Sequence, residues 1–153
     1  MSRAQLLALP TSGSAWTSLK AVADGSLGAP DLCDQDNKHD ARTLAVALVY
    51  ARTGQAAYFT KARDAIMSAI GTEQVGCHNA ILSLGRQLGA YVLAADFITL
   101  SGTDETSFRA WLSDIRTRNL GGHSRWYVLR TTAGNSSNNW GTFALASMVA
   151  ADL

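Results

Sequence analysis

The chain has 153 residues, of which 47% are apolar and only 16% are charged, with 13 basic and 12 acidic side chains. This length fits a single globular domain, 1–153, and so low a charge indicates extensive burial and excludes a disordered chain. No apolar run reaches the roughly 18 residues that a membrane span needs, and we expect neither a membrane nor a nucleic-acid partner.

Abundant alanine and leucine, with only two prolines, favour helix. Apolar residues recur at helical spacing, and Gly54 stands where a helix should end. The only β-like tetrad, 126–129, is short. Taken in chain order, helices are expected near 2–9, 14–23, 38–53, 55–71, 78–100, 103–119 and 139–153.

Between the second and third of these helices lies a loop, 25–37, that runs into a polar stretch, 34–40. One interpretation of this stretch is a helix cap followed by solvated side chains. The other is the rim of a binding groove, for which Gln35, Asn37 and His39 are candidate ligand-binding residues.

The two cysteines, Cys33 and Cys77, suit either buried thiols or one disulfide of a secreted protein. With His39 and His78 they supply the residue types of a closed zinc site, but their spacing fits no compact ligand pair. We therefore expect no metal and no cofactor.

The expected helices pair into antiparallel hairpins, because the turns that join them are short. The helix 78–100 is apolar around more than half of its circumference, as an inner helix would be, whereas those around residues 61 and 114 are one-sided. Such alternation predicts an all-α chain of antiparallel hairpins forming part of an (α/α) toroid, with a compact bundle as the alternative. Ile66, Leu84, Leu88 and Trp111 should lie in the core.

The stretch 115–151 contains four arginines, one histidine and no carboxylate. Arginine binds carboxylate or sulfate in bidentate fashion, asparagine amides suit sugar hydroxyls, and aromatic rings offer an apolar face to a pyranose. A solvated loop with a helix cap is the alternative. The candidate ligand-binding residues of this stretch are His123, Arg125, Trp126, Tyr127, Arg130, Asn138, Asn139 and Trp140.

Two segments carry a resemblance: 37–45, which reads NKHDARTLA, and 138–141, which reads NNWG. Together they resemble the alginate lyase superfamily of polysaccharide lyases, α/α-toroid enzymes that cleave uronic-acid polysaccharides. The resemblance implies that Asn138 or Asn139 neutralises the substrate carboxylate. The family's usual histidine after the asparagine pair is replaced here by Trp140, and its catalytic tyrosine usually lies further along the chain.

The expected function is therefore β-elimination on an anionic polysaccharide such as alginate, by a secreted or periplasmic protein. Asn138, Asn139 and Arg125 would neutralise the carboxylate, His123 would serve as base and Tyr127 as acid. Two alternatives stay open: a non-catalytic glycan-binding or helical-repeat scaffold, and an unsaturated-uronide hydrolase using Asp34, Asp36 or Asp40. The last helix reaches the chain end without a glycine cap, so we expect a C-terminally truncated domain.

Overall fold

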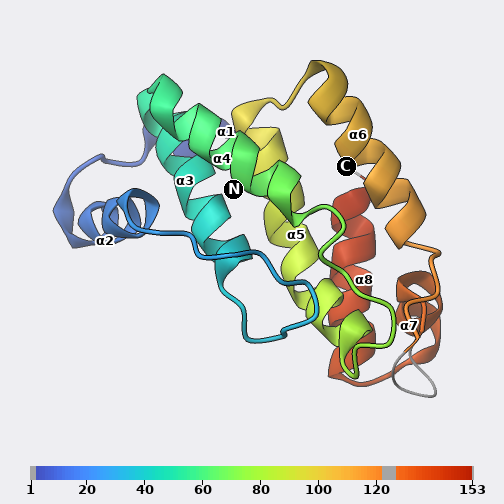
Figure 1. The fold of residues 1–153 in the computed structure, drawn as a ribbon. Coiled ribbons are helices and arrows are strands. Elements are labelled where there is room, and N and C mark those ends of the chain that lie inside the picture. The colour runs from blue at the N-terminus through green and yellow to red at the C-terminus, as the bar shows by residue number, and fades with distance from the viewer. Residues whose placement is uncertain (1–2, 122–126, 153) are drawn as a thin grey trace.

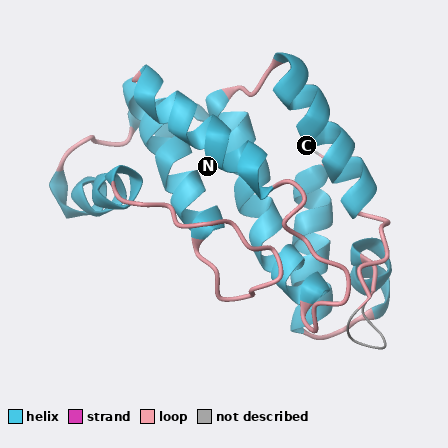
Figure 2. Ribbon diagram, in the orientation of Figure 1, coloured by secondary structure: helices cyan, strands magenta, loops and turns pink. Residues whose placement is uncertain are grey.

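The computed structural model describes residues 3–121 and 127–152, and every regular element in these ranges is an α-helix (Figure 2). This confirms the predicted all-α class. The expected helices are present with small shifts at their ends. The helices are α1 Arg3–Ala8, α2 Gly13–Asp24, α3 His39–Thr53, α4 Ala56–Ala69, α5 Ala80–Ile98, α6 Gly102–Ile115, α7 Leu129–Asn135 and α8 Asn139–Ala151.

Three of these helices form a row in which α5 lies between α3 and α8 and contacts both (Figure 1). All three run in the same direction, whereas α4 and α6 run back in the opposite one. The predicted antiparallel pairing of α3 with α4 is therefore present, joined at Gly54, which adopts a left-handed conformation with φ 65°. A consequence of this arrangement is that α3, α5 and α8 all begin at one end of the molecule.

The core is built around α5, which packs against neighbours on several sides. Ile66, Leu84, Leu88 and Trp111 are all buried, as predicted. By length and mean hydropathy (1.2), α5 resembles a membrane span, although we expected no such segment from the sequence. However, 67% of that window is buried inside the fold, as in the central helix of a helical domain.

A close approach between α5 and α8 depends on Gly85. A Cβ atom at this position would lie 3.0 Å from the Ala144 nitrogen and 3.1 Å from the Phe143 carbonyl carbon. The Ser147 hydroxyl donates a hydrogen bond of 2.7 Å to the Gly85 carbonyl oxygen, which fixes the register of the two helices. The absence of a side chain at Gly85 thus allows α8 to lie directly against α5.

A disulfide between Cys33 and Cys77, with Cα atoms 5.8 Å apart, joins the loop before α3 to the loop before α5. The Gly76 N–H donates to the Leu120 carbonyl at 2.6 Å, which ties the segment after α6 to the same place. Of the alternatives that the sequence left open for the cysteines, the disulfide is the one observed.

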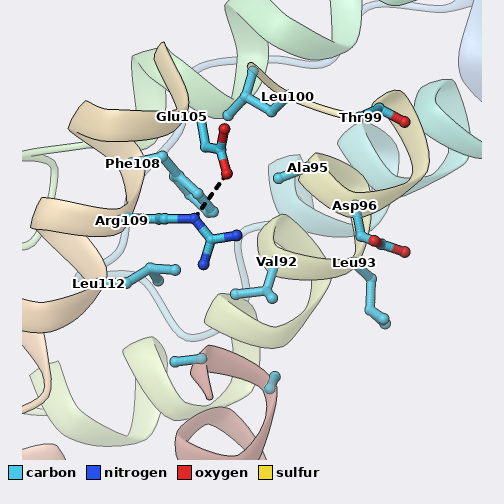
Figure 3. Close-up of a pocket in the computed structure, with 12 residues that line it drawn as sticks. Val92, Leu93, Ala95, Asp96, Thr99, Leu100, Glu105, Phe108, Arg109 and Leu112 are labelled. Carbon is cyan, nitrogen blue, oxygen red and sulfur yellow. Dashed lines mark hydrogen bonds and ion pairs between the residues drawn. The ribbon is translucent and has the colours of Figure 1, made fainter. Parts of the chain in front are cut away.

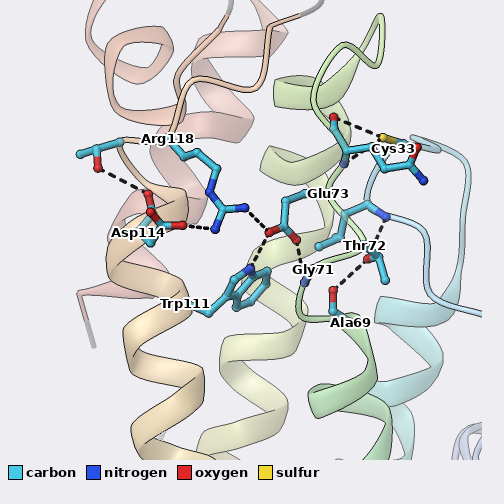
Figure 4. Close-up of polar contacts among 11 residues, drawn as sticks. Cys33, Ala69, Gly71, Thr72, Glu73, Trp111, Asp114 and Arg118 are labelled. Atoms are coloured by element: carbon cyan, nitrogen blue, oxygen red, sulfur yellow. Dashed lines mark hydrogen bonds and ion pairs between the residues drawn. The ribbon is translucent and has the colours of Figure 1, made fainter.

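Near the disulfide lies the buried carboxylate of Glu73 (Figure 4). Glu73 accepts hydrogen bonds from the Trp111 indole at 3.0 Å, from Arg118 at 2.8 Å and from the Gly71 backbone N–H at 3.0 Å. Arg118 also pairs with Asp114. The network connects α6 to the loop that follows α4 and satisfies a charge that would otherwise be costly to bury.

Helix α7 was not predicted. It begins at Leu129, directly after Val128 in extended conformation, so the β-like pattern of 126–129 corresponds in part to the entry into a helix. Contacts with α8 hold α7 in place.

Candidate functional site

The asparagine pair lies where α7 turns into α8. The Asn138 side-chain oxygen accepts hydrogen bonds from the Trp140 N–H at 3.0 Å and from the Ser136 hydroxyl at 2.6 Å, so Asn138 is the N-cap of α8. Its amide nitrogen makes no hydrogen bond to the described residues. Asn139 occupies the first position of the helix, and both side chains are exposed.

The glycine of the same motif has a packing role. A Cβ at Gly141 would collide with the Ser136 carbonyl group, so this position admits only glycine without a shift of the α7–α8 turn. Trp140 is half-buried and packs against the core. Gly141 and Trp140 therefore position the turn, whereas the amides of Asn138 and Asn139 project into solvent.

The structure describes only some of the remaining candidate residues of the stretch 115–151. Tyr127 is 38% exposed, and its carbonyl accepts from the Leu120 N–H at 2.8 Å. Arg130 is exposed on α7. His123, the predicted base, Arg125, which was expected to neutralise the substrate carboxylate, and Trp126 lie outside the described residues.

The absence of carboxylates from this stretch of sequence does not hold in space for two of its arginines. Arg116 pairs with Asp152 at 2.7 Å, and Arg118 pairs with Glu73 and Asp114. Asp152 and Glu73 come from other parts of the chain, Asp114 lies four residues before Arg118, and together these acids occupy the guanidinium groups. Arg116 and Arg118 are therefore structural and add little positive charge for a ligand.

The polar run before α3 is mainly occupied by local contacts. Asn37 accepts from the His39 N–H at 2.8 Å and donates to the Ala29 carbonyl at 3.1 Å, and Gln35 is half-buried. His39 is only 3% exposed and lies in the interior, not on the rim that we expected. Its Nδ1 is 2.8 Å from the Tyr91 hydroxyl on α5, which explains its burial.

This buried pair has perturbed acidities. Burial, and then the charge of Arg42, lower the pKa of His39, which favours the neutral imidazole. Burial, and then the charge of Asp40, raise the pKa of Tyr91 well above its ordinary value. Burial also raises the pKa of the Asp40 carboxyl, which retains its proton to higher pH than an exposed aspartate.

One cation near this region was not singled out from the sequence. Arg86 extends from α5 between the start of α3 and α8, with its guanidinium carbon 5.8 Å from the centre of the Phe143 ring. Its nearest ion-pair contact is Asp36, at 3.8 Å. The signal in the sequence was an arginine in the first half of a mainly apolar helix.

A cavity of about 480 Å³ lies at the other end of α5, between α6 and the end of α8 (Figure 3). Its lining is largely apolar, and its charged pair, Glu105 and Arg109, is joined at 2.9 Å. Neither asparagine of the α7–α8 turn lines this cavity, so the cavity and the asparagine pair are separate features.

Comparisons of the chain with protein-family models, with curated proteins and with solved structures found no match.

Proposed function

We propose that the protein is a polysaccharide lyase that cleaves an anionic, uronic-acid-containing polymer by β-elimination, on a scaffold that is part of an (α/α) toroid. The row of α3, α5 and α8, with α4 and α6 running back, supports such a scaffold, since a toroid alternates inner and outer helices in this way. The disulfide suits a secreted or periplasmic location, where thiols are oxidised.

The observation that carries the proposal is the pair of exposed amides at the start of α8. Capping explains the carbonyl oxygen of Asn138, but it leaves the Asn138 amide nitrogen and the whole Asn139 side chain without a structural role among the described residues. Amide donors at a helix N-terminus are suited to bind a carboxylate, because the helix dipole also favours negative charge there.

The chemistry follows from the poor acidity of the proton at C5 of a uronate. Donors that stabilise the developing enolate of the neighbouring carboxylate make that proton removable, as in an oxyanion hole. Asn138 and Asn139 are assigned this task. His123 is proposed as the base that removes the proton, and Tyr127, which is partly exposed, as the acid for the leaving oxygen.

The test measures the ultraviolet absorbance of 4,5-unsaturated uronate released from intact polymer, using the protein with all residues that its gene encodes. Asn139→Ala should lower kcat by about 100- to 1000-fold, as for the loss of one oxyanion donor. Asn138→Ser should lower kcat to a similar extent, while the serine hydroxyl still caps α8. Asn135→Ala, an exposed asparagine at the end of α7, serves as control. Normal turnover by both Asn139→Ala and Asn138→Ser would contradict the proposed mechanism.

A second candidate function is hydrolysis of unsaturated uronides, favoured by one observation: the raised pKa of the half-buried Asp40 suits a general acid. This activity would consume the ultraviolet absorbance of unsaturated oligosaccharides and would be lost in Asp40→Asn. A protein that binds uronate polymer and performs neither reaction would instead be a glycan-binding scaffold.

A further inference from the structure

Arg86 differs from most of the arginines whose side chains the structure describes. Those arginines donate hydrogen bonds to a carboxylate or a backbone carbonyl, as Arg63 does to Asp104 at 2.6 Å. Among the described residues, the carboxylate nearest to Arg86 is that of Asp36, at 3.8 Å, which is beyond hydrogen-bonding distance. The half-buried Asp40 carboxyl also interacts electrostatically with Arg86. The Asp36 side chain is 74% exposed, so this contact is weak and easily exchanged.

The position of the guanidinium group is nevertheless defined. It lies by the ring of Phe143, an arrangement in which the ring face attracts the cation and limits its movement. The Arg86 side chain is 35% exposed and the Phe143 residue 38% exposed. A planar cation is thus held by a ring while its N–H donors remain available to a ligand.

The surroundings suit a sugar ring. Phe143 provides an exposed apolar surface beside the cation. A guanidinium fork next to an aromatic ring matches a pyranose that bears a carboxylate.

The place of Phe143 on α8 connects this surface to the asparagine pair. Asn139 and Phe143 are at i and i+4 of the same helix, so they share one face and are separated by one turn. A ligand carboxylate at Arg86 would therefore lie close to a sugar bound at Asn139.

We propose that Arg86 and Phe143 form a subsite for a uronate unit adjacent to the unit that reacts at the asparagine pair. Arg86 binds the carboxylate of that unit, and Phe143 orients the guanidinium group and contacts the ring. This assignment rests on the proposed lyase function for the identity of the polymer, and it makes Arg86 a determinant of specificity for charged over neutral sugars.

The experiment measures dissociation constants by isothermal titration with uronate oligosaccharides, under conditions in which absorbance shows no cleavage. The same oligosaccharides with their carboxyl groups reduced to alcohols are the neutral ligands. Arg86→Gln should weaken uronate binding by about 10- to 100-fold, since a charged bidentate contact is lost. Its affinity for the neutral ligand should not change.

Two further variants keep the proposal testable if Arg86→Gln folds poorly. Arg86→Lys should give an intermediate loss, because it keeps the charge but not the fork. Phe143→Leu should weaken uronate binding by a few-fold, about the size of an exposed cation–π contact. The control is Arg109→Gln, which removes an exposed arginine of α6 that is paired with Glu105. This variant should bind uronate like the wild type.

Uronate affinity that is unchanged in Arg86→Gln, an equal loss for the neutral ligand, or no uronate binding by the wild type would overturn the subsite. Binding that depends on Arg86 in a protein without elimination activity would retain the subsite and reject the lyase. Elimination that does not depend on Arg86 would retain the lyase and reject the subsite.

Discussion

Glu73 has a side chain that is only 1% exposed, and three donors from different parts of the chain surround it. A buried carboxylate is stable only if it is paired and fully hydrogen-bonded. Because Trp111 and Arg118 belong to the α6 region and Gly71 to the loop after α4, the carboxylate holds two segments together through a single group.

Glu73→Gln should destabilise the protein by about 2 kcal/mol. The substitution removes the negative charge to which Arg118 and the Trp111 indole N–H donate hydrogen bonds, and it places amide hydrogens near the guanidinium group. Urea unfolding measures the change. The matched control is Glu105→Gln, which removes a carboxylate from the exposed pair with Arg109 and should cost less than about 1 kcal/mol. Equal losses in the two variants would contradict the role assigned to Glu73.

His39 should make the free energy of unfolding depend on pH. Its pKa in the folded protein is lowered from 6.5, mainly by burial, so the unfolded chain binds the proton more readily. The contribution of neutral His39 is complete above about pH 6.5 and is lost as the pH falls toward the lowered pKa.

The measurement compares wild type and His39→Gln in urea between about pH 8 and 5. The stability of the wild type should fall more steeply with acid than that of the variant. Asp40 titrates with the opposite slope, because its pKa is raised, but its contribution is common to both proteins and is removed by subtraction. Parallel curves would show that His39 is not kept neutral by its surroundings.

For individual residues, the sequence predicted the core better than the candidate site. Ile66, Leu84 and Trp111 follow from helical periodicity, which is a local property. Arg116 and Arg118 each pair with a carboxylate that is distant in the chain, Asp152 and Glu73 respectively, so local composition overstated the free positive charge. The burial of His39 was not predictable, because it depends on Tyr91 from another helix.

Among the helices, the long and periodic ones were predicted closely, whereas α7 was missed. Its seven residues include two threonines, a glycine and an asparagine, which have low helix propensity. The helix forms because it packs on α8. A short segment stabilised by tertiary contact carries little periodic signal, and the β-branched and aromatic residues before it favoured a strand.

The close approach of α5 and α8 at Gly85 can be tested against a second helical glycine that has open space around it, Gly134. Gly85→Ala places a methyl group against the backbone of α8 and should cost about 1–3 kcal/mol through overpacking. Gly134→Ala, in α7, meets no atom within 4 Å and should be neutral or stabilising by up to about 1 kcal/mol. Thermal unfolding of both variants checks the difference, and a stabilised Gly85→Ala would refute the close packing.

For the molecule as a whole, the sequence predicted hairpins because short turns and glycine stops are local signals. The pairing of Cys33 with Cys77 was left open, since spacing along a chain does not report distance in space. The same limit applies to the meeting of the Gly76 and Leu120 segments, which becomes visible only when α5 and α6 are placed.

The disulfide should contribute about 4 kcal/mol to stability, the loop-entropy value for a separation of 44 residues. The Cys33→Ser, Cys77→Ser double variant should therefore unfold at lower urea concentration than the oxidised wild type. The wild type treated with a reductant should behave like the variant. An unchanged unfolding midpoint in both cases would contradict a stabilising disulfide.

The disulfide also determines what a single cut of the backbone would do. The α3–α4 turn at Gly54 and Gln55 is exposed and lies within the segment that Cys33 and Cys77 enclose. A protease acting there would leave two pieces that stay joined through sulfur and separate only after reduction. This turn is thus a natural place to divide the chain for a split reporter, in which reassembly of the two halves is controlled by thiol oxidation.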